Sequence, residues 1–220
     1  MIKSMGLLQR RVDLDADGFR DHYENKHAPM AEEMLGFAGY QRNYPESRSA
    51  REALGLDGLS EFWFQSEGET ARIGQLMQGE VGSQFIEDEL RFMNTQKNAT
   101  YGVTERLFGA RPAPGDAIRA VAITRLPAGG RAGQRDRRLD FEAERCRERR
   151  LPGVLAALYS VPIGASMRLP VGRPGIGCIE SLWLSDREAL GRCNHWRAAV
   201  GAVALSVVNE AGRPVLEPLG

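Results

Sequence analysis

The chain has 220 residues, and its 29 Lys and Arg residues balance its 29 Asp and Glu residues. A neutral chain without an acidic or basic tail argues against nucleic acid and against an anionic membrane surface as partners. No apolar stretch of about 18 residues occurs, so no membrane-spanning helix is expected. The three cysteines stand far apart without a CxxC or metal-ligand spacing, which favours a reduced, cytoplasmic setting without a metal.

The first half of the chain alternates between strand and helix patterns. Alternating apolar residues indicate strands, and apolar residues three and four apart indicate helices. Strands are expected over residues 2–11, 37–48, 59–65 and 95–108, and helices over residues 17–35, 67–78 and 83–92. The resulting order, β-α-β-β-α-β, is that of the split βαβ, or ferredoxin-like, unit.

A linker follows at residues 111–115, where two prolines and a glycine suit neither helix nor sheet. It divides the chain into predicted units over residues 1–110 and 116–220. The pattern then begins again. Strands are expected over residues 117–126, 154–163, 178–184 and 204–217, and helices over residues 134–149 and 186–200.

The two halves resemble each other in sequence. Glu61-Phe62-Trp63 can be laid over Ser181-Leu182-Trp183, 120 positions later, and Phe19 lies over Phe141 at a shift of 122. These matches keep one order along the chain, which indicates an internal duplication. A unit of this kind has helices on one sheet face only, so its bare face has to be covered. We therefore predict an α+β fold in which two ferredoxin-like βαββαβ units pack their antiparallel sheets face to face as an α/β barrel around a cavity.

The first predicted helix carries the most informative residues. Phe19, Tyr23 and His27 are four positions apart, so they share one inward-facing stripe. Pro29 lacks an N–H group and is expected to interrupt the helix, which leaves His27 beside carbonyls without their usual partners. His27 is then either an acid/base group or a core histidine that is hydrogen-bonded to one of those carbonyls. His22 lies on the polar face and is expected to be solvated.

Two predicted strands supply further candidates. Glu61 and Trp63 share one face of their strand. If that face lines the cavity, the Glu61 carboxylate could orient His27 or bind a substrate hydroxyl; otherwise it is a surface charge. On the preceding strand, Tyr40 and Asn43 could hydrogen-bond a substrate, with ordinary strand positions as the alternative.

Four segments carry a family pattern: Gly6-Leu7-Leu8-Gln9-Arg10-Arg11, Phe19-x-x-x-Tyr23-x-x-x-His27-Ala28-Pro29, Gly39-Tyr40-Gln41-Arg42-Asn43 and Glu61-Phe62-Trp63-Phe64. In this order and at these distances they resemble the EthD-type family of the dimeric α/β-barrel superfamily. The resemblance covers residues 2 to 108 well and the second half poorly. The family's helix typically has an aromatic residue at the Tyr23 place and a histidine at the His27 place. Members include lactone isomerases, dehydratases, decarboxylases and polyketide cyclases, and related barrels are monooxygenases.

The resemblance implies a small cofactor-free lyase or isomerase, of the dehydratase, cyclase or decarboxylase class, acting on a hydrophobic oxygenated small molecule in the barrel cavity. His27 would be the acid/base, because imidazole titrates near neutral pH, and Tyr23 would polarise the substrate carbonyl. Glu61 is the third candidate catalytic residue. The candidate substrate-binding residues are Phe19, Tyr40, Asn43 and Trp63. Two alternatives stay open: a protein that binds a small molecule without converting it, and a monooxygenase.

The second half departs from the family pattern. Its counterpart helix, over residues 141–150, lacks a histidine, and Ser181 stands at the place of Glu61. We therefore expect one site, in the first half, with the second half as a lid and structural partner. A homodimer of the tandem chain is a further alternative.

Overall fold

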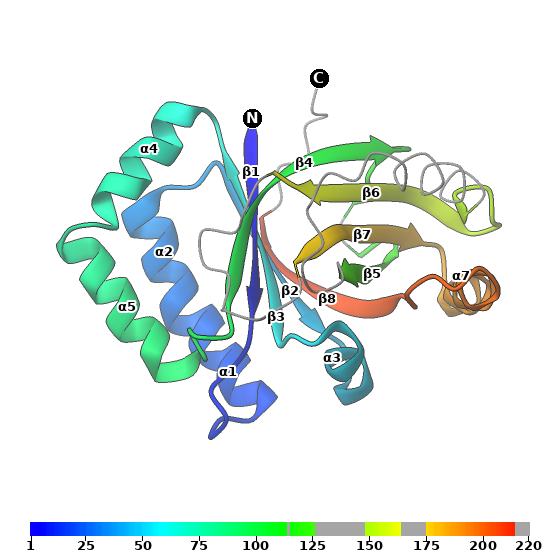
Figure 1. The fold of residues 1–220 in the computed structure, drawn as a ribbon, viewed down its shortest axis with the longest axis horizontal. Helices are drawn as coiled ribbons and strands as arrows, with labels where there is room; N and C mark the ends of the chain where they lie inside the picture. The colour runs from blue at the N-terminus through cyan, green and yellow to red at the C-terminus, as the bar shows by residue number, and fades with distance from the viewer. Residues whose placement is uncertain (114, 126–147, 164–174, 214–220) are drawn as a thin grey trace.

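Antiparallel strands form a closed barrel at the centre of the molecule (Figure 1). The computed structural model describes residues 1–113, 115–125, 148–163 and 175–213. Within these ranges the barrel strands are β1 (Ile2–Leu8), β2 (Gly39–Pro45), β3 (Gly58–Phe64), β4 (Ala99–Phe108), β5 (Ile118–Arg125), β6 (Val154–Pro162), β7 (Ile176–Leu184) and β8 (Ser206–Arg213). Around the barrel they follow the order β1-β3-β2-β8-β5-β7-β6-β4.

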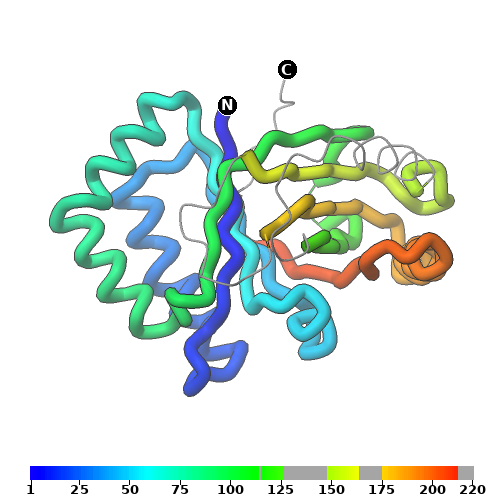
Figure 2. The backbone as a smooth tube through the Cα atoms, viewed as in Figure 1, coloured from blue at the N-terminus to red at the C-terminus, as the bar shows by residue number. Residues whose placement is uncertain are grey.

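The two halves contribute strands in the same order, β4-β1-β3-β2 and β8-β5-β7-β6. The predicted α+β barrel is confirmed, but its two sheets are not separate layers facing each other. Pairing of β2 with β8, and of β4 with β6, joins them at both edges into one closed sheet. Closure satisfies the backbone groups that an open edge would leave unpaired. In Figure 2 the chain can be followed from β1 to β4, the last strand of the first half, which pairs with β1.

Helices cover the barrel on two sides. The described helices are α1 (Ala16–His22), a π-helical turn η1 (Tyr23–His27), α2 (Ala28–Leu35), α3 (Arg48–Leu54), α4 (Glu67–Leu76), α5 (Glu80–Phe92) and α7 (Arg187–Ala199). Figure 1 shows α1, α2, α4 and α5 together on one side and α7 on the other. None of these helices is long and apolar enough to cross a bilayer. The helix expected over 134–149 lies, apart from its last two residues, outside the described ranges. The division of the chain into two ferredoxin-like units remains a prediction.

The first predicted helix is continuous but irregular. Asp15 caps its start by accepting a hydrogen bond from the Gly18 amide. We expected Pro29 to interrupt the helix, and this expectation is wrong. The helix instead widens into the π turn, in which the Ala28 amide donates a hydrogen bond to the Tyr23 carbonyl. Pro29 then lies in the first turn of α2, where a missing N–H group is tolerated best.

Helix α3 was not predicted from the sequence, because we assigned its first residue to a strand and the rest to a loop. Ser47 begins it by accepting a hydrogen bond from the Ala50 amide, and Gly55 ends it in a left-handed conformation with φ of 67°. A serine before the first turn and a glycine after the last are the standard boundary signals of a helix.

Apolar cores fill the barrel and the spaces under the helices. One end of the barrel interior is packed by side chains of several strands, among them Met5, Leu59, Val121 and Ile179. A second core lies between the first-half sheet and its helices. A third lies between the second-half sheet and α7. The sheet therefore presents two chemically distinct faces, and each candidate residue belongs to one of them.

Candidate functional site

The seven predicted site residues divide between the two faces of the sheet. Phe19, Tyr23 and Tyr40 belong to the core under the helices, and His27 packs there against Tyr23. Asn43, Glu61 and Trp63 are on the other face and point into the barrel. The hypothesis that Glu61 orients His27 is therefore wrong, because the sheet itself separates the two side chains. Sequence alternation shows which residues share a face, but not which face meets the helices.

The carboxylate that holds His27 is Asp88 of α5. His27 Nδ1 lies 2.9 Å from Asp88 Oδ2, and His22 Nε2 lies 2.8 Å from Asp88 Oδ1. His22, which we expected to be solvated, is thus bound and stacks on Phe92. Asp88 was missed from the sequence. Its signal is its spacing from Phe85 and Phe92, which at three and four positions places it on the inward face of α5.

The surroundings of His27 favour its neutral form. Burial lowers the pKa of His27 below its usual value, although the hydrogen bond that His27 donates to Asp88 works in the opposite direction. Burial disfavours the charge of Asp88 as well, but hydrogen bonds from His22 and His27 outweigh that cost and hold its pKa below the usual range. A neutral His27 beside an ionised Asp88 must carry its proton on Nδ1, because only a donor can bond there. Nε2 then carries a free lone pair, the requirement for a base.

A chain of hydroxyl groups lies next to His27. Tyr40 donates a 2.8 Å hydrogen bond to the Tyr23 hydroxyl, which lies 2.6 Å from Ser60 Oγ. The rings of Tyr23 and His27 meet edge to face, 5.2 Å between centroids. Burial raises the pKa of Tyr23 to about 12, although its hydrogen bonds with Ser60 and Tyr40 work in the opposite direction. The phenol therefore stays protonated at neutral pH and can donate a hydrogen bond.

A charged pair borders this aromatic region. Arg42 Nη2 lies 2.7 Å from Glu24 Oε2, and its guanidinium carbon lies 4.6 Å from the centre of the Tyr40 ring. Tyr44 donates a hydrogen bond of 2.5 Å to the same carboxylate. Sequence reasoning missed Arg42 and Glu24, since each looks like an ordinary exposed charge of its element.

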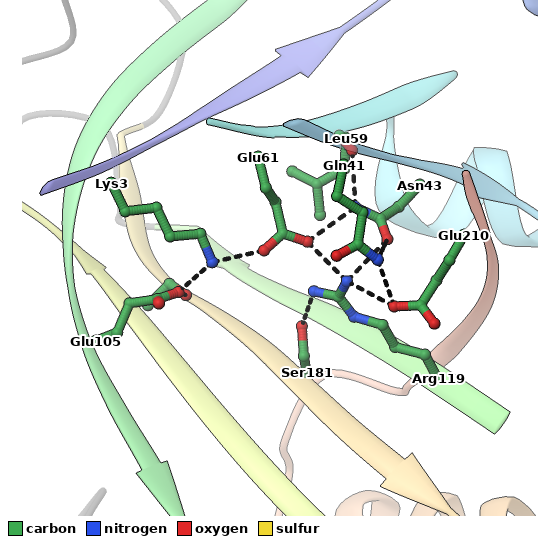
Figure 3. A network of polar contacts seen from close by, with 10 residues as sticks. Lys3, Gln41, Asn43, Leu59, Glu61, Glu105, Arg119, Ser181 and Glu210 are labelled. Atoms are coloured by element: carbon green, nitrogen blue, oxygen red, sulfur yellow. Dashed lines mark hydrogen bonds and ion pairs between the residues drawn. The ribbon is translucent and has the colours of Figure 1, made fainter. Parts of the chain in front are cut away.

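On the opposite face, Glu61 is the centre of a polar network inside the barrel (Figure 3). Its Oε2 lies 2.5 Å from Lys3 Nζ, and its Oε1 lies 2.7 Å from Arg119 Nη1. Asn43 donates to the same Oε1 at 2.9 Å. Burial would raise the pKa of Glu61, but Arg119 and Lys3 hold it far below its usual range. A proton-transfer role for Glu61 has no support in this geometry.

The network shows the internal repeat in three dimensions. Lys3 lies opposite Trp63 on paired strands, and Arg119 lies opposite Trp183. Ser181 stands at the place of Glu61 and is uncharged. Its hydroxyl accepts a 2.9 Å hydrogen bond from Arg119 Nη2. One carboxylate, Glu61, therefore bridges two cations that occupy equivalent places in the two halves.

The face of the second half that corresponds to the Tyr23 region has a different chemistry. Arg197 of α7 is fully buried, with Nη1 2.7 Å from Glu148 and Nη2 2.9 Å from Glu180. Glu180 stands at the place of Ser60 in the repeat. Among the described residues, no group of three or more His, Cys, Asp or Glu side chains is arranged to hold a metal ion.

Comparisons with known proteins agree with this architecture. No curated protein sequence matches the chain. An anthrone oxidase-like protein of known structure is similar with a TM-score of 0.58 and 13% identity, over 100% of this chain and 96% of that chain. A candidate chlorite dismutase is similar with a TM-score of 0.50 and 11% identity, over 98% of this chain and 95% of that chain. At these identities the likeness shows the fold alone.

A comparison of the sequence with protein-family models is more specific than the likeness in fold. Residues 11–96 match the model of the EthD domain. This segment runs from the end of β1 through α5, and so contains His27, Asp88 and the hydroxyl chain. The predicted resemblance is confirmed over these residues: this segment of the chain is similar to the EthD domain, and it lies within a closed antiparallel barrel.

Proposed function

We propose that this protein acts on a small molecule, as a cofactor-free lyase or isomerase of the dehydratase, cyclase or decarboxylase class. The substrate would be a hydrophobic, oxygenated compound bound between the first-half sheet and its helices, with His27 as acid/base. The observation that carries the proposal is the 2.9 Å contact of His27 Nδ1 with Asp88, within an otherwise aromatic surrounding. It fixes the ring and its tautomer as a general base requires.

The hydroxyl chain supplies a partner for that base. Tyr23, Tyr40 and Ser60 have one hydroxyl proton each, and two hydrogen bonds join them. One proton is left for an outside acceptor. A substrate enolate oxygen is such an acceptor, and a donor placed where this charge develops would stabilise it. His27 Nε2 would remove the proton beside the carbonyl and return it later, so the reaction needs no cofactor.

The test uses the two histidines that share Asp88. Purified wild type, His27→Gln and His22→Gln are incubated with a panel of aromatic polyketides, lactones and β-keto acids. We expect loss of His27 to lower kcat by about 10² to 10⁴-fold, the usual contribution of general acid/base catalysis. His22→Gln is the matched control, because it removes the same type of contact with the same carboxylate. Equal turnover by wild type and His27→Gln would contradict the proposal.

A binding protein is the second candidate, because the groups concerned are closely covered. Tyr23 is 1% exposed and His27 is 5% exposed, so a substrate enters only if the surrounding side chains move. A binding protein predicts a ligand that stabilises the wild type, loses affinity with His27→Gln and yields no product from either. The monooxygenase alternative is checked in the same panel with an oxygen electrode, where oxygen uptake in step with product would replace the lyase proposal.

A further inference from the structure

The end of the barrel that holds the Glu61 network has a second notable feature, the side chain of Arg111. Arg111 lies in the connection between β4 and β5, which links the two halves. Its guanidinium carbon lies 5.8 Å from the centre of the Trp63 ring and 4.9 Å from that of Trp183. These tryptophans occupy equivalent places in the two halves, so Arg111 lies between the repeats at the polar end of the barrel.

We propose that this end of the barrel is a binding site for a small hydroxycarboxylate, with Arg111 as its principal ligand-binding residue. The site is on the opposite face of the sheet from His27. It is independent of the proposed lyase or isomerase activity, and neither proposal requires the other.

The first argument is the missing partner of Arg111. Within the described part of the chain its guanidinium makes contacts with the tryptophan rings but no hydrogen bond and no ion pair. Burial lowers the pKa of Arg111, although Glu61 and other nearby carboxylates work against this. A guanidinium has five N–H donors and stays charged at any ordinary pH, so a partly buried one requires acceptors for its hydrogen bonds. The described residues provide none for Arg111. A carboxylate matches that planar group with two parallel hydrogen bonds.

The second argument is that the nearby carboxylates are occupied. Glu61 pairs with Lys3 and Arg119, Glu105 pairs with Lys3, and Glu210 pairs with Arg119. These contacts satisfy the two other cations of the network and leave Arg111 out. Among the residues that the structure describes, no carboxylate is therefore left to pair with Arg111, and the proposal assigns that place to the carboxylate of a bound ligand. Because three carboxylates lie near, we expect that anion to bind weakly, with Kd in the range of about 1 mM.

The third argument concerns two buried atoms of the polar network, one on Arg119 and one on Gln41. Arg119 stacks on the same Trp183 ring, at 5.1 Å, and its Nε has no hydrogen-bond acceptor. Gln41 Oε1 has no donor, although Gln41 Nε2 bonds to Glu210 and Asn43. Buried polar atoms are rarely left without partners, and such exceptions require an explanation. A ligand with both a carboxylate and a hydroxyl group supplies the missing acceptor and the missing donor, once small side-chain shifts admit it.

The opposing explanation is that Arg111 is a structural strut, stacked between two rings to hold the halves together. Cation–π contacts alone can stabilise such an arrangement. The two explanations differ in one respect. A strut affects stability whatever the solute, whereas a binding site makes stability depend on the concentration of one class of anion.

The experiment uses glycolate, the smallest hydroxycarboxylate, with neutral glycolamide as its uncharged counterpart. The thermal midpoint of the full chain is measured with increasing sodium glycolate, against sodium chloride at equal ionic strength. The wild type is compared with Arg111→Met and with Arg48→Met, which removes an equal charge from an exposed Arg48–Glu52 pair. We expect glycolate to stabilise the wild type and Arg48→Met, at least tenfold weaker binding to Arg111→Met, and no effect of glycolamide.

A measurement on the wild type alone tests the proposal even if Arg111→Met folds poorly. In the wild type, the Nε–Hε resonance of Arg111 is followed by ¹H–¹⁵N NMR during the glycolate titration, and it should shift and saturate. No shift, an equal shift with glycolamide, or equal stabilisation of Arg111→Met would overturn the proposal. His27→Gln should bind glycolate as the wild type does. A negative result for glycolate binding at Arg111 therefore leaves the proposed activity of His27 untouched, and the reverse also holds.

Discussion

Ser60 and Glu61 are neighbours on β3, yet their side chains belong to two different environments separated by the sheet. Ser60 Oγ lies 2.6 Å from the Tyr23 hydroxyl under the helices, whereas Glu61 lies 2.5 Å from Lys3 inside the barrel. The alternation of a β-strand produces this division. It separates the neutral, aromatic side with a potential base from the ion-paired side that stabilises the barrel. The predictions below follow from that separation.

The acid limb of the activity should report His27. Since burial lowers its pKa, the base form of His27 persists below pH 6.5, the usual value of an imidazole. Asp88 raises this pKa, so Asp88→Asn should move the acid limb of kcat/KM to lower pH and also reduce kcat, because the tautomer is no longer fixed. The pH profiles of wild type and Asp88→Asn measure both effects. An acid limb that stays in place would show that His27 does not titrate in the reaction.

The same shift links His27 to stability. The pKa of His27 is lower in the folded than in the unfolded protein, so the unfolded chain binds more protons as pH falls. The contribution of neutral His27 is therefore fully present above pH 6.5 and declines as pH falls through and below that value. Urea unfolding at pH 7.5 and pH 5.5 should show a smaller loss of stability for His27→Gln than for the wild type. Equal losses would place the titration on other groups.

The hydroxyl of Tyr23 should affect turnover more than binding. Tyr23→Phe keeps the ring and removes the central member of the Tyr40–Tyr23–Ser60 chain. If the chain stabilises a developing enolate, kcat falls by about 10 to 10³-fold while KM changes little. Tyr44→Phe is the matched control, since its hydroxyl bonds only to Glu24 in the described structure. A change confined to KM would favour the binding protein.

Glu61 should matter for stability rather than for chemistry. Glu61→Gln removes the buried carboxylate that Lys3 and Arg119 share and leaves them only Glu105 and Glu210. Breaking a buried ion pair by removing one partner costs about 3–5 kcal/mol. Glu87→Gln is the control, because it breaks an exposed pair with Arg91 that contributes little. Chemical unfolding of both variants gives the comparison. A Glu61→Gln variant as stable as the wild type would show that the network is not structural.

Much of the architecture could be predicted because it follows from local patterns. The stripe of Phe19, Tyr23 and His27 is buried as its spacing predicts, and the matching shifts in the two halves correspond to equivalent places in the barrel. The alternation along β3 correctly paired Glu61 with Trp63.

The rest depended on contacts between residues far apart in the chain. Asp88 is 61 positions from His27, and Arg119 comes from the other half of the chain to meet Glu61. No local pattern states which helix covers which strand, so the true partner of His27 could not be identified. Nor could the π turn be predicted, since Pro29 is compatible with either a break or a widened turn.

The central claim is that His27 removes a proton beside a substrate carbonyl. The most direct measurement is deuterium exchange in D₂O, in which a β-keto or lactone ligand from the panel is incubated with each protein and followed by ¹H NMR. Wild type and His22→Gln should exchange the α-hydrogen faster than the uncatalysed background, and His27→Gln should not. Exchange at the same rate by wild type and His27→Gln would contradict the claim.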